Sequence, residues 1–130
     1  MNKNMKKLRI SLMSLITLLL LSACWQNTQD NTGINHIVLV WFKADTTPTE
    51  LKAIINATRQ LKDIEGIQSL SLGKAIKSER KIVDSSFSLG IHMRFKDKMA
   101  MQSYLNHPRH LEFLDTMVKP KLEKVVVYDF

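Results

Sequence analysis

The hydrophobic positions of this chain follow two different spacings after residue 35. Continuous apolar runs, or apolar residues at every second position, are typical of strands and occur over residues 36–42, 67–74, 86–95 and 125–130. Apolar residues at every third or fourth position are typical of helices and occur over residues 48–64 and 98–118. The pattern therefore predicts the element order β-α-β-β-α-β, with the last helix broken in two.

Short motifs mark where these helices begin and end. Thr47-Pro48-Thr49-Glu50 combines an N-cap threonine, a proline in the first turn and a glutamate three residues after the cap, which is the pattern of a capping box. Asp97 can cap the next helix. Pro108 suits the first turn of the final helical segment, because its missing N–H has no partner there in any case, and Pro120 marks the end of that segment.

The predicted order is that of a ferredoxin-like α+β fold, in which a four-stranded antiparallel sheet carries helices on one face. The first strand is apolar on both of its faces. One face carries Val38, Val40 and Phe42, and the other carries Ile37, Leu39 and Trp41. Because the helices cover only one face of such a sheet, we expect a second copy to cover the other face, which gives a homodimeric α+β barrel.

The N-terminal residues have the regions of a bacterial secretory leader. Basic residues come first, at Lys3, Lys6, Lys7 and Arg9. The apolar run over residues 10–21 is short for a membrane span and has the length of a signal-peptide core. It ends in Leu21-Ser22-Ala23-Cys24, which resembles the lipobox of bacterial lipoproteins. An ordinary signal peptide and a retained anchor helix are the alternatives.

The lipobox resemblance divides the chain into three segments. Residues 1–23 would be a lipoprotein signal peptide, residues 24–35 a polar tether that begins at the lipidated Cys24, and residues 36–130 the folded domain. Acyl chains on Cys24 would hold the protein on a lipid bilayer without a membrane span. Trp25 stands where the inner-membrane retention signal carries Asp, so within the cell envelope we expect the periplasmic face of the outer membrane rather than the inner membrane.

The formal net charge of +7 overstates the charge of the mature domain. Four of the 19 Lys and Arg residues lie in the leader, where there are no acidic residues, so the mature chain carries a net charge of +3. That value is ordinary for a small domain and gives no reason to expect nucleic acid as a partner. We interpret the nearest basic cluster as a solvated loop, with attraction to anionic lipid as an alternative. The cluster comprises Lys74, Lys77, Arg80 and Lys81.

The stretch Tyr104-Leu105-Asn106-His107-Pro108-Arg109-His110 contains three groups that can transfer protons. With Pro108 in the first turn of a helix, His110 shares a face with an apolar stripe and points inward. The stripe comprises Phe113, Leu114 and Met117. An inward histidine near the end of the preceding helix, where Tyr104 lies, is a candidate site. The alternative is a structural histidine whose second ring nitrogen bonds a backbone carbonyl.

Tyr104 and His110 could act as acid and base. A helix N-terminus disfavours imidazolium, so His110 could take a proton from carbon near pH 7 while Tyr104 polarises a carbonyl oxygen. This chemistry predicts a lyase or cyclase that acts on a small, apolar carbonyl compound. Two other hypotheses are a non-catalytic protein that binds an apolar molecule or a partner, and a metal site formed by His36, His107 and His110. We expect no cofactor.

These residues resemble a known family, the stress-responsive A/B barrel domain (Dabb) proteins of the dimeric α+β barrel group. The resemblance covers residues 36–130. It rests on the early histidine of His36-Ile-Val-Leu-Val, on Gly66 and Leu72-Gly73 around the second strand, on the block from Tyr104 to Phe113, and on the closing Lys119-Pro120 and Val125 to Asp129.

The resemblance implies the fold and, in outline, a site. Most members have no assigned activity, which favours binding of a small apolar molecule or a partner over catalysis. In members that are polyketide cyclases the pocket lies between helices and sheet, and the tyrosine and last histidine of the block act as acid and base. Carried over, these are Tyr104 and His110, and His36 would line the same pocket. The wider predicted pocket comprises Val38, Leu89, His107, Phe113 and Leu114.

Some cyclases carry a further histidine on the helix-facing side of the third strand. In this chain the corresponding positions hold only apolar side chains, at Phe87, Leu89, Ile91, Met93 and Phe95. His92 has the opposite parity and should face the dimer interface. Arg94 and Asp129 are candidates for a cross-strand ion pair.

Overall fold

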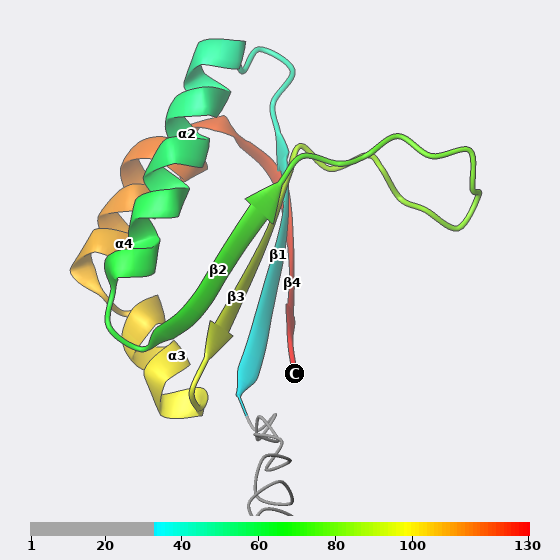
Figure 1. The fold of residues 1–130 in the computed structure, drawn as a ribbon. Coiled ribbons are helices and arrows are strands. Elements are labelled where there is room, and N and C mark those ends of the chain that lie inside the picture. The colour runs from blue at the N-terminus through cyan, green and yellow to red at the C-terminus, as the bar shows by residue number, and fades with distance from the viewer. Residues whose placement is uncertain (1–32) are drawn as a thin grey trace, which may run out of the picture. The chain divides into compact units, whose positions relative to one another are not determined.

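The computed structural model of the protein describes residues 33–130, which form one sheet with helices packed on one side of it (Figure 1). The predicted signal peptide, the lipidation site Cys24 and almost all of the predicted tether lie outside the described residues. Within residues 33–130, no helix is long and apolar enough to cross a membrane.

The sheet has four strands in the spatial order β2-β3-β1-β4, and every neighbouring pair is antiparallel. The strands are β1 (Ile34–Phe42), β2 (Ile67–Gly73), β3 (Leu89–Phe95) and β4 (Leu122–Asp129). The central position of β1 and the edge position of β4 are those of a ferredoxin-like fold. The predicted α+β architecture is therefore confirmed.

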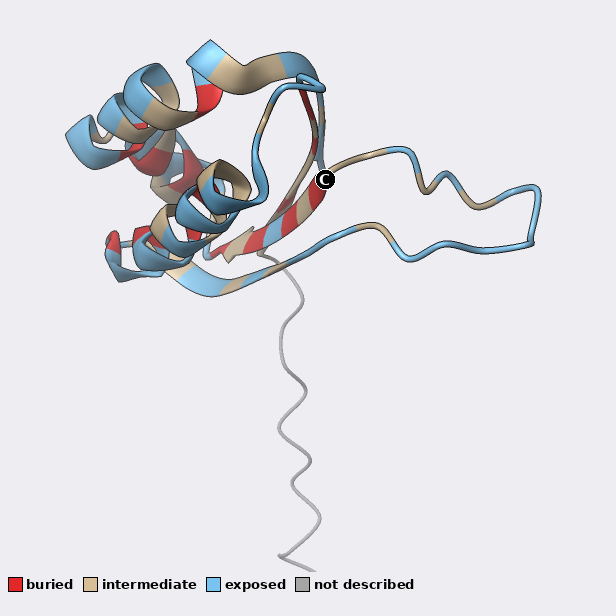
Figure 2. Cartoon of the chain, turned by 90° about the horizontal axis from the view of Figure 1, so that it is seen from above, coloured by how far each residue is buried: buried red, intermediate tan, exposed pale blue. Residues whose placement is uncertain are grey.

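The helices all lie on the same side of the sheet (Figures 1 and 2). They are α2 (Pro48–Gln60), α3 (Lys98–Leu105) and α4 (Pro108–Phe113). A short 3₁₀ turn, Leu61–Asp63, extends α2. The chain after α4 forms a π-helical turn, Leu114–Val118, and then a 3₁₀ turn, Lys119–Lys121, before it enters β4. The predicted single helix over 108–118 is therefore α-helical only as far as Phe113.

The predicted helix starts are confirmed by their hydrogen bonds. Thr47 Oγ1 accepts a bond from the Glu50 N–H at 3.2 Å, and Glu50 Oε2 accepts one from the Thr47 N–H at 2.8 Å, which completes the capping box. Asp97 Oδ1 accepts a bond from the Ala100 N–H at 2.8 Å at the start of α3.

The two faces of β1 separate as the alternation predicts. Val40 and Phe42 are buried in the core, together with the helix-facing residues of β3, which are Leu89, Ile91, Met93 and Phe95. The opposite face carries Ile37, Leu39 and Trp41, which are only partly buried in a single copy of the chain. We call this opposite side of the sheet the outer face.

The strand ends differ from the prediction in one way that changes a side chain's face. β3 begins at Leu89 rather than Ser86. Phe87 therefore precedes the strand and does not continue its alternation. Its ring lies against Trp41, with centroids 6.3 Å apart, so Phe87 belongs to the outer face. The prediction that Phe87 faces the helices is therefore wrong. β1 begins two residues earlier than expected and β4 three residues earlier, because both continue the antiparallel pairing.

Candidate functional site

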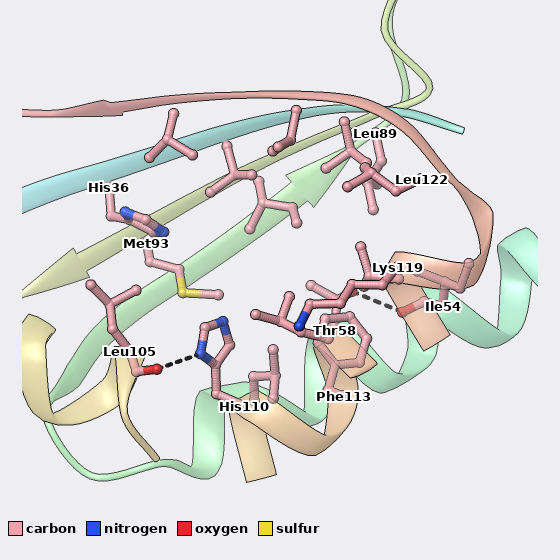
Figure 3. Close-up of a pocket in the computed structure, with 18 of the residues that line it drawn as sticks. His36, Ile54, Thr58, Leu89, Met93, Leu105, His110, Phe113, Lys119 and Leu122 are labelled. Atoms are coloured by element: carbon pink, nitrogen blue, oxygen red, sulfur yellow. Dashed lines mark hydrogen bonds between the residues drawn. The ribbon is translucent and has the colours of Figure 1, made fainter. Parts of the chain in front are cut away.

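A cavity of about 330 Å³ lies between the helix layer and the sheet (Figure 3). Directly opposed residues of antiparallel strands point to the same face, so alternate residues of β1 and β4 form one wall together. These are Val38, Val40, Val125 and Val127. The helices supply the other wall, which includes Ile54, Leu61, Leu105, Phe113, Leu114 and Val118. The walls of the cavity are therefore mainly hydrocarbon.

The cavity reaches the protein surface beside the edge strand β4. Val125 and Val127 line the cavity and yet each is 45% exposed. Lys119, which follows the π-helical turn, also lines the cavity, and its ammonium group pairs with the exposed carboxylate of Asp115. A small molecule can therefore enter between β4 and the last helical segment.

The rings of His36, Tyr104 and His110 line the cavity. His36 and His110 lie at one end of it and approach each other from opposite walls (Figure 3). The ring of Tyr104 lies 4.4 Å from that of His110 and 6.4 Å from that of His36, measured between centroids. β1 supplies His36, the last turn of α3 supplies Tyr104, and the first turn of α4 supplies His110. The break between the two helices therefore brings tyrosine and histidine together.

The orientation of His110 is set by the end of the preceding helix. Its Nδ1 lies 3.1 Å from the carbonyl oxygen of Leu105, and because a carbonyl only accepts, Nδ1 must carry the proton. In the neutral ring Nε2 is then an unprotonated acceptor. Burial lowers the pKa of His110, and the charges that His36 and His107 can carry lower it further, although the bond to Leu105 opposes them. His110 is therefore a neutral imidazole at neutral pH.

Tyr104 is buried among aromatic rings, with Phe95 at a centroid distance of 5.2 Å on one side and His110 on the other. Burial raises the pKa of Tyr104, so its hydroxyl keeps its proton. This hydroxyl belongs to a residue that lines the cavity. It can therefore donate to an oxygen of a bound molecule.

His36 is held by Asp129, which was predicted to pair with Arg94. Its Nδ1 lies 2.6 Å from Asp129 Oδ1, because the two residues are directly opposed in the β1–β4 register. The predicted pair of Arg94 with Asp129 is therefore wrong: Arg94 lies opposite Asn35 and has the parity of the outer face. The strand alternation contained the signal for Asp129, since its position places it on the same face as Val125 and Val127.

His107 does not line the cavity, unlike the other predicted pocket residues, which are His36, Val38, Leu89, Phe113 and Leu114. It is the N-cap of α4, and its Nδ1 accepts a hydrogen bond from the Arg109 N–H at 3.2 Å. Within the described part of the chain, no three His, Cys, Asp or Glu side chains are grouped so that they could hold a metal ion. The three-histidine arrangement considered above therefore does not form.

His92 lies on the outer face, as its parity predicts, where its Nε2 is 3.0 Å from Asn35 Oδ1. Thr58 of α2 lines the cavity and is fully buried, and it was not among the predicted pocket residues. Its hydroxyl donates to the Ile54 carbonyl at 2.8 Å, so it adds little polarity to the wall. The apolar character of the cavity away from the three rings is therefore preserved.

The fold and the cavity together define a ferredoxin-like α+β domain with an internal apolar site that is polar at one end. The chain belongs to the family of the Stress responsive A/B Barrel Domain (Dabb), whose model matches residues 34–130. A stress-response A/B barrel domain-containing protein of Arabidopsis thaliana is 30% identical over 100 residues, which are 76% of this chain and 86% of the relative.

Solved structures share the fold. A Dabb family protein from Mesorhizobium loti with a ferredoxin-like fold has a TM-score of 0.61 and 25% identity, over 75% of this chain and 94% of that protein. A dimeric ferredoxin-like protein from Thermobifida fusca has a TM-score of 0.63 and 22% identity, over 75% of this chain and 89% of that protein. The hydroxynitrile lyase of Passiflora edulis has a TM-score of 0.68 and 19% identity, over 75% of this chain and 91% of that protein. The last two likenesses concern the fold alone.

Proposed function

We propose that the domain binds a small apolar molecule that carries one hydrogen-bonding oxygen, such as a ketone or aldehyde, in the cavity between helices and sheet. The observation that carries this proposal is the arrangement of an apolar chamber with Tyr104 and His110 at one end. A volume of about 330 Å³ lies at the lower end of the range for small-molecule sites.

The physical basis is the contrast between the walls and the end of the cavity. An apolar chamber offers water few hydrogen bonds, so an apolar molecule can replace solvent there at little cost. The Tyr104 hydroxyl supplies a donor for the oxygen of the ligand, which would otherwise lose its bonds to water on burial. The ligand should therefore enter with its oxygen directed toward the three rings.

The test is thermal unfolding of the purified protein with a series of 2-alkanones from 2-propanone to 2-undecanone. We expect saturable stabilisation that grows with chain length until the cavity is filled. A ligand at a hundred times its Kd stabilises by about 2.7 kcal/mol. If no chain length changes the melting temperature, the domain does not bind this class of molecule.

Two matched variants separate the cavity from the rest of the surface. Val127→Trp fills the mouth of the cavity, whereas Leu111→Trp alters α4 at a residue that does not line it. Both residues are 45% exposed, so the two substitutions add similar surface. We expect only Val127→Trp to abolish the stabilisation by ketones.

A second candidate function, proton transfer, is favoured by the neutral state of His110 and by the protonated hydroxyl of the adjacent Tyr104. In it, the Tyr104 hydroxyl bonds the carbonyl oxygen, and His110 Nε2 takes a proton from the adjacent carbon to give an enol-like intermediate. One structural neighbour is a hydroxynitrile lyase, but at 19% identity that likeness supports the fold and not the reaction.

Proton transfer is testable without knowledge of the natural substrate. In D₂O, the protein should exchange the protons next to the carbonyl of 2-nonanone faster than buffer does, as followed by NMR. His110→Gln should abolish this exchange and leave binding intact. Binding with no exchange above the buffer rate would reject catalysis and leave the binding function standing.

We also propose that the domain is a homodimer anchored to a membrane by acylated Cys24. The apolar residues on the outer face and the dimeric relative from Thermobifida fusca support the dimer. The lipobox-like Leu21-Ser22-Ala23-Cys24 supports the anchor.

Mass spectrometry of the detergent-extracted protein should find an N-terminal peptide that begins at acylated Cys24, and an unmodified Cys24 would contradict the anchor. Fractionation of the two membranes then tests the outer-membrane location.

A further inference from the structure

The segment between β2 and β3, residues 74–88, has no regular secondary structure over most of its length. Loops of this length without helix or strand are uncommon in compact domains, and where they are ordered they usually have a function. This loop extends away from the sheet on the side opposite to the helices, as both views of the molecule show (Figures 1 and 2).

The loop carries two large aliphatic side chains that contact almost nothing in their own chain. Ile76 and Ile82 are each 84% exposed, more than any other large hydrophobic residue of the described part of the chain. A single exposed apolar residue is ordinary, but two isoleucines on one projecting loop form a feature that a contact partner would stabilise by burial.

The base of the loop is fixed to the outer face of the sheet. The indole N–H of Trp41 donates to Ser86 Oγ at 2.9 Å, and Asp84 Oδ1 accepts a bond from the Ser86 N–H at 2.8 Å. The ring of Phe87 packs edge-on against Trp41. Apolar surface therefore continues from β1 through Trp41 and Phe87 toward the projecting isoleucines.

We propose that residues 74–88 form a clasp that embraces a second copy of this chain, with Ile76 and Ile82 buried against it. The inference rests on the proposed homodimer, in which the outer faces of two sheets meet. The loop projects on the side of the sheet away from the helices (Figure 1), which is the side where the second sheet of that dimer would lie. The continuity of the loop base with the outer face favours this occupant over a lipid surface, although basic residues flank the isoleucines.

Site-specific photocrosslinking in the full-length, membrane-associated protein tests the clasp. A benzoylphenylalanine is placed at Ile76 or Ile82, at Tyr128 as a reporter of the outer face, and at Met99 as a control. Tyr128 is paired with Ile37 of β1, and Met99 is 76% exposed but belongs to α3 in the helix layer. We expect covalent homodimers from positions 76, 82 and 128 and none from position 99.

The reporter separates failure of the clasp from failure of the dimer. If homodimers form from position 128 alone, the clasp is overturned and the dimer stands. The same conclusion follows if positions 76 and 82 crosslink to lipid or to another protein. No homodimer from any position would overturn both. The substitution pair Ile76→Ser and Ile82→Ser should also raise the dimer dissociation constant at least about tenfold in detergent, whereas Met99→Ser should leave it unchanged. An unchanged constant in the loop variant contradicts the proposal.

Discussion

Asp129 Oδ1 lies 2.6 Å from His36 Nδ1, across the pair formed by the central strand β1 and the edge strand β4. A carboxylate in this position requires a proton on Nδ1, so the neutral imidazole has an unprotonated Nε2. An exposed acid at the sheet edge therefore sets the tautomer and the ring orientation of a buried histidine inside the cavity.

Asp129→Asn should allow His36 to adopt either neutral tautomer. Nitrogen chemical shifts of His36 are expected to change from a single Nδ1–H tautomer to a mixture, because an amide can either donate or accept. Since Asp129 is exposed, the free energy of unfolding should fall by no more than about 1 kcal/mol. Asp115→Asn, which removes another exposed paired carboxylate, should leave the His36 shifts unchanged.

The buried His110 should make the fold sensitive to mild acid. Because burial lowers its pKa below the ordinary 6.5, the unfolded chain binds more protons than the folded chain as the pH falls below 6.5. The free energy of unfolding should therefore decrease between pH 6.5 and the lower pKa of the folded state. Chemical denaturation at a series of pH values should give a smaller decrease for His110→Gln than for the wild type. An equal decrease in both proteins would show that His110 does not carry the effect.

Tyr104→Phe should separate packing from recognition. The ring contacts with Phe95 and His110 remain, so the free energy of unfolding should change by less than about 1 kcal/mol. The lost hydroxyl should weaken binding of 2-nonanone about tenfold in calorimetry, which corresponds to about one hydrogen bond. Tyr128→Phe, on the other face of the sheet, should bind the ketone like the wild type.

The cap of α2 should contribute to stability without touching the cavity. Thr47→Ala removes the acceptor of the Glu50 N–H and should cost about 1 kcal/mol, or about 4–8 °C in melting temperature. Thr49→Ala, two residues along, is the matched control and should change the melting temperature little, because the capping hydrogen bonds join only Thr47 and Glu50. Equal losses in the two variants would mean that the capping box is not the cause.

The sequence was sufficient for the fold because its local signals agreed with each other. Each of three local features specifies one element through short-range chemistry. They are the apolar residues on both faces of β1, the capping box at Thr47 and the helix break at Pro108. The same break lies between Tyr104 and His110, so their proximity could be predicted from spacing, whereas their roles as acid and base came also from the family resemblance. Periodicity failed at Phe87, which precedes the start of β3 and whose contact with Trp41 places it on the outer face.

The remaining site features depend on register, which the sequence does not display. The contact of His36 with Asp129 follows from which residues of β1 and β4 are opposed, and a shift of one residue would remove it. His107 was expected in the pocket because it is close in sequence to His110, but its ring caps α4 instead. The position of Lys119 beside the cavity depends on the π-helical turn, for which no sequence motif was recognised.

The most direct test of the proposed binding site is an NMR measurement of intermolecular NOEs between 2-nonanone and the protein labelled at its methyl groups and aromatic rings. We expect NOEs from the alkyl chain to Val38, Val125 and Val127, and from the methyl group next to the carbonyl to Tyr104 and His110. We expect none to Ile37 or Val126 on the outer face. NOEs confined to the outer face, or none at ketone concentrations that stabilise the fold, would contradict the cavity as the binding site.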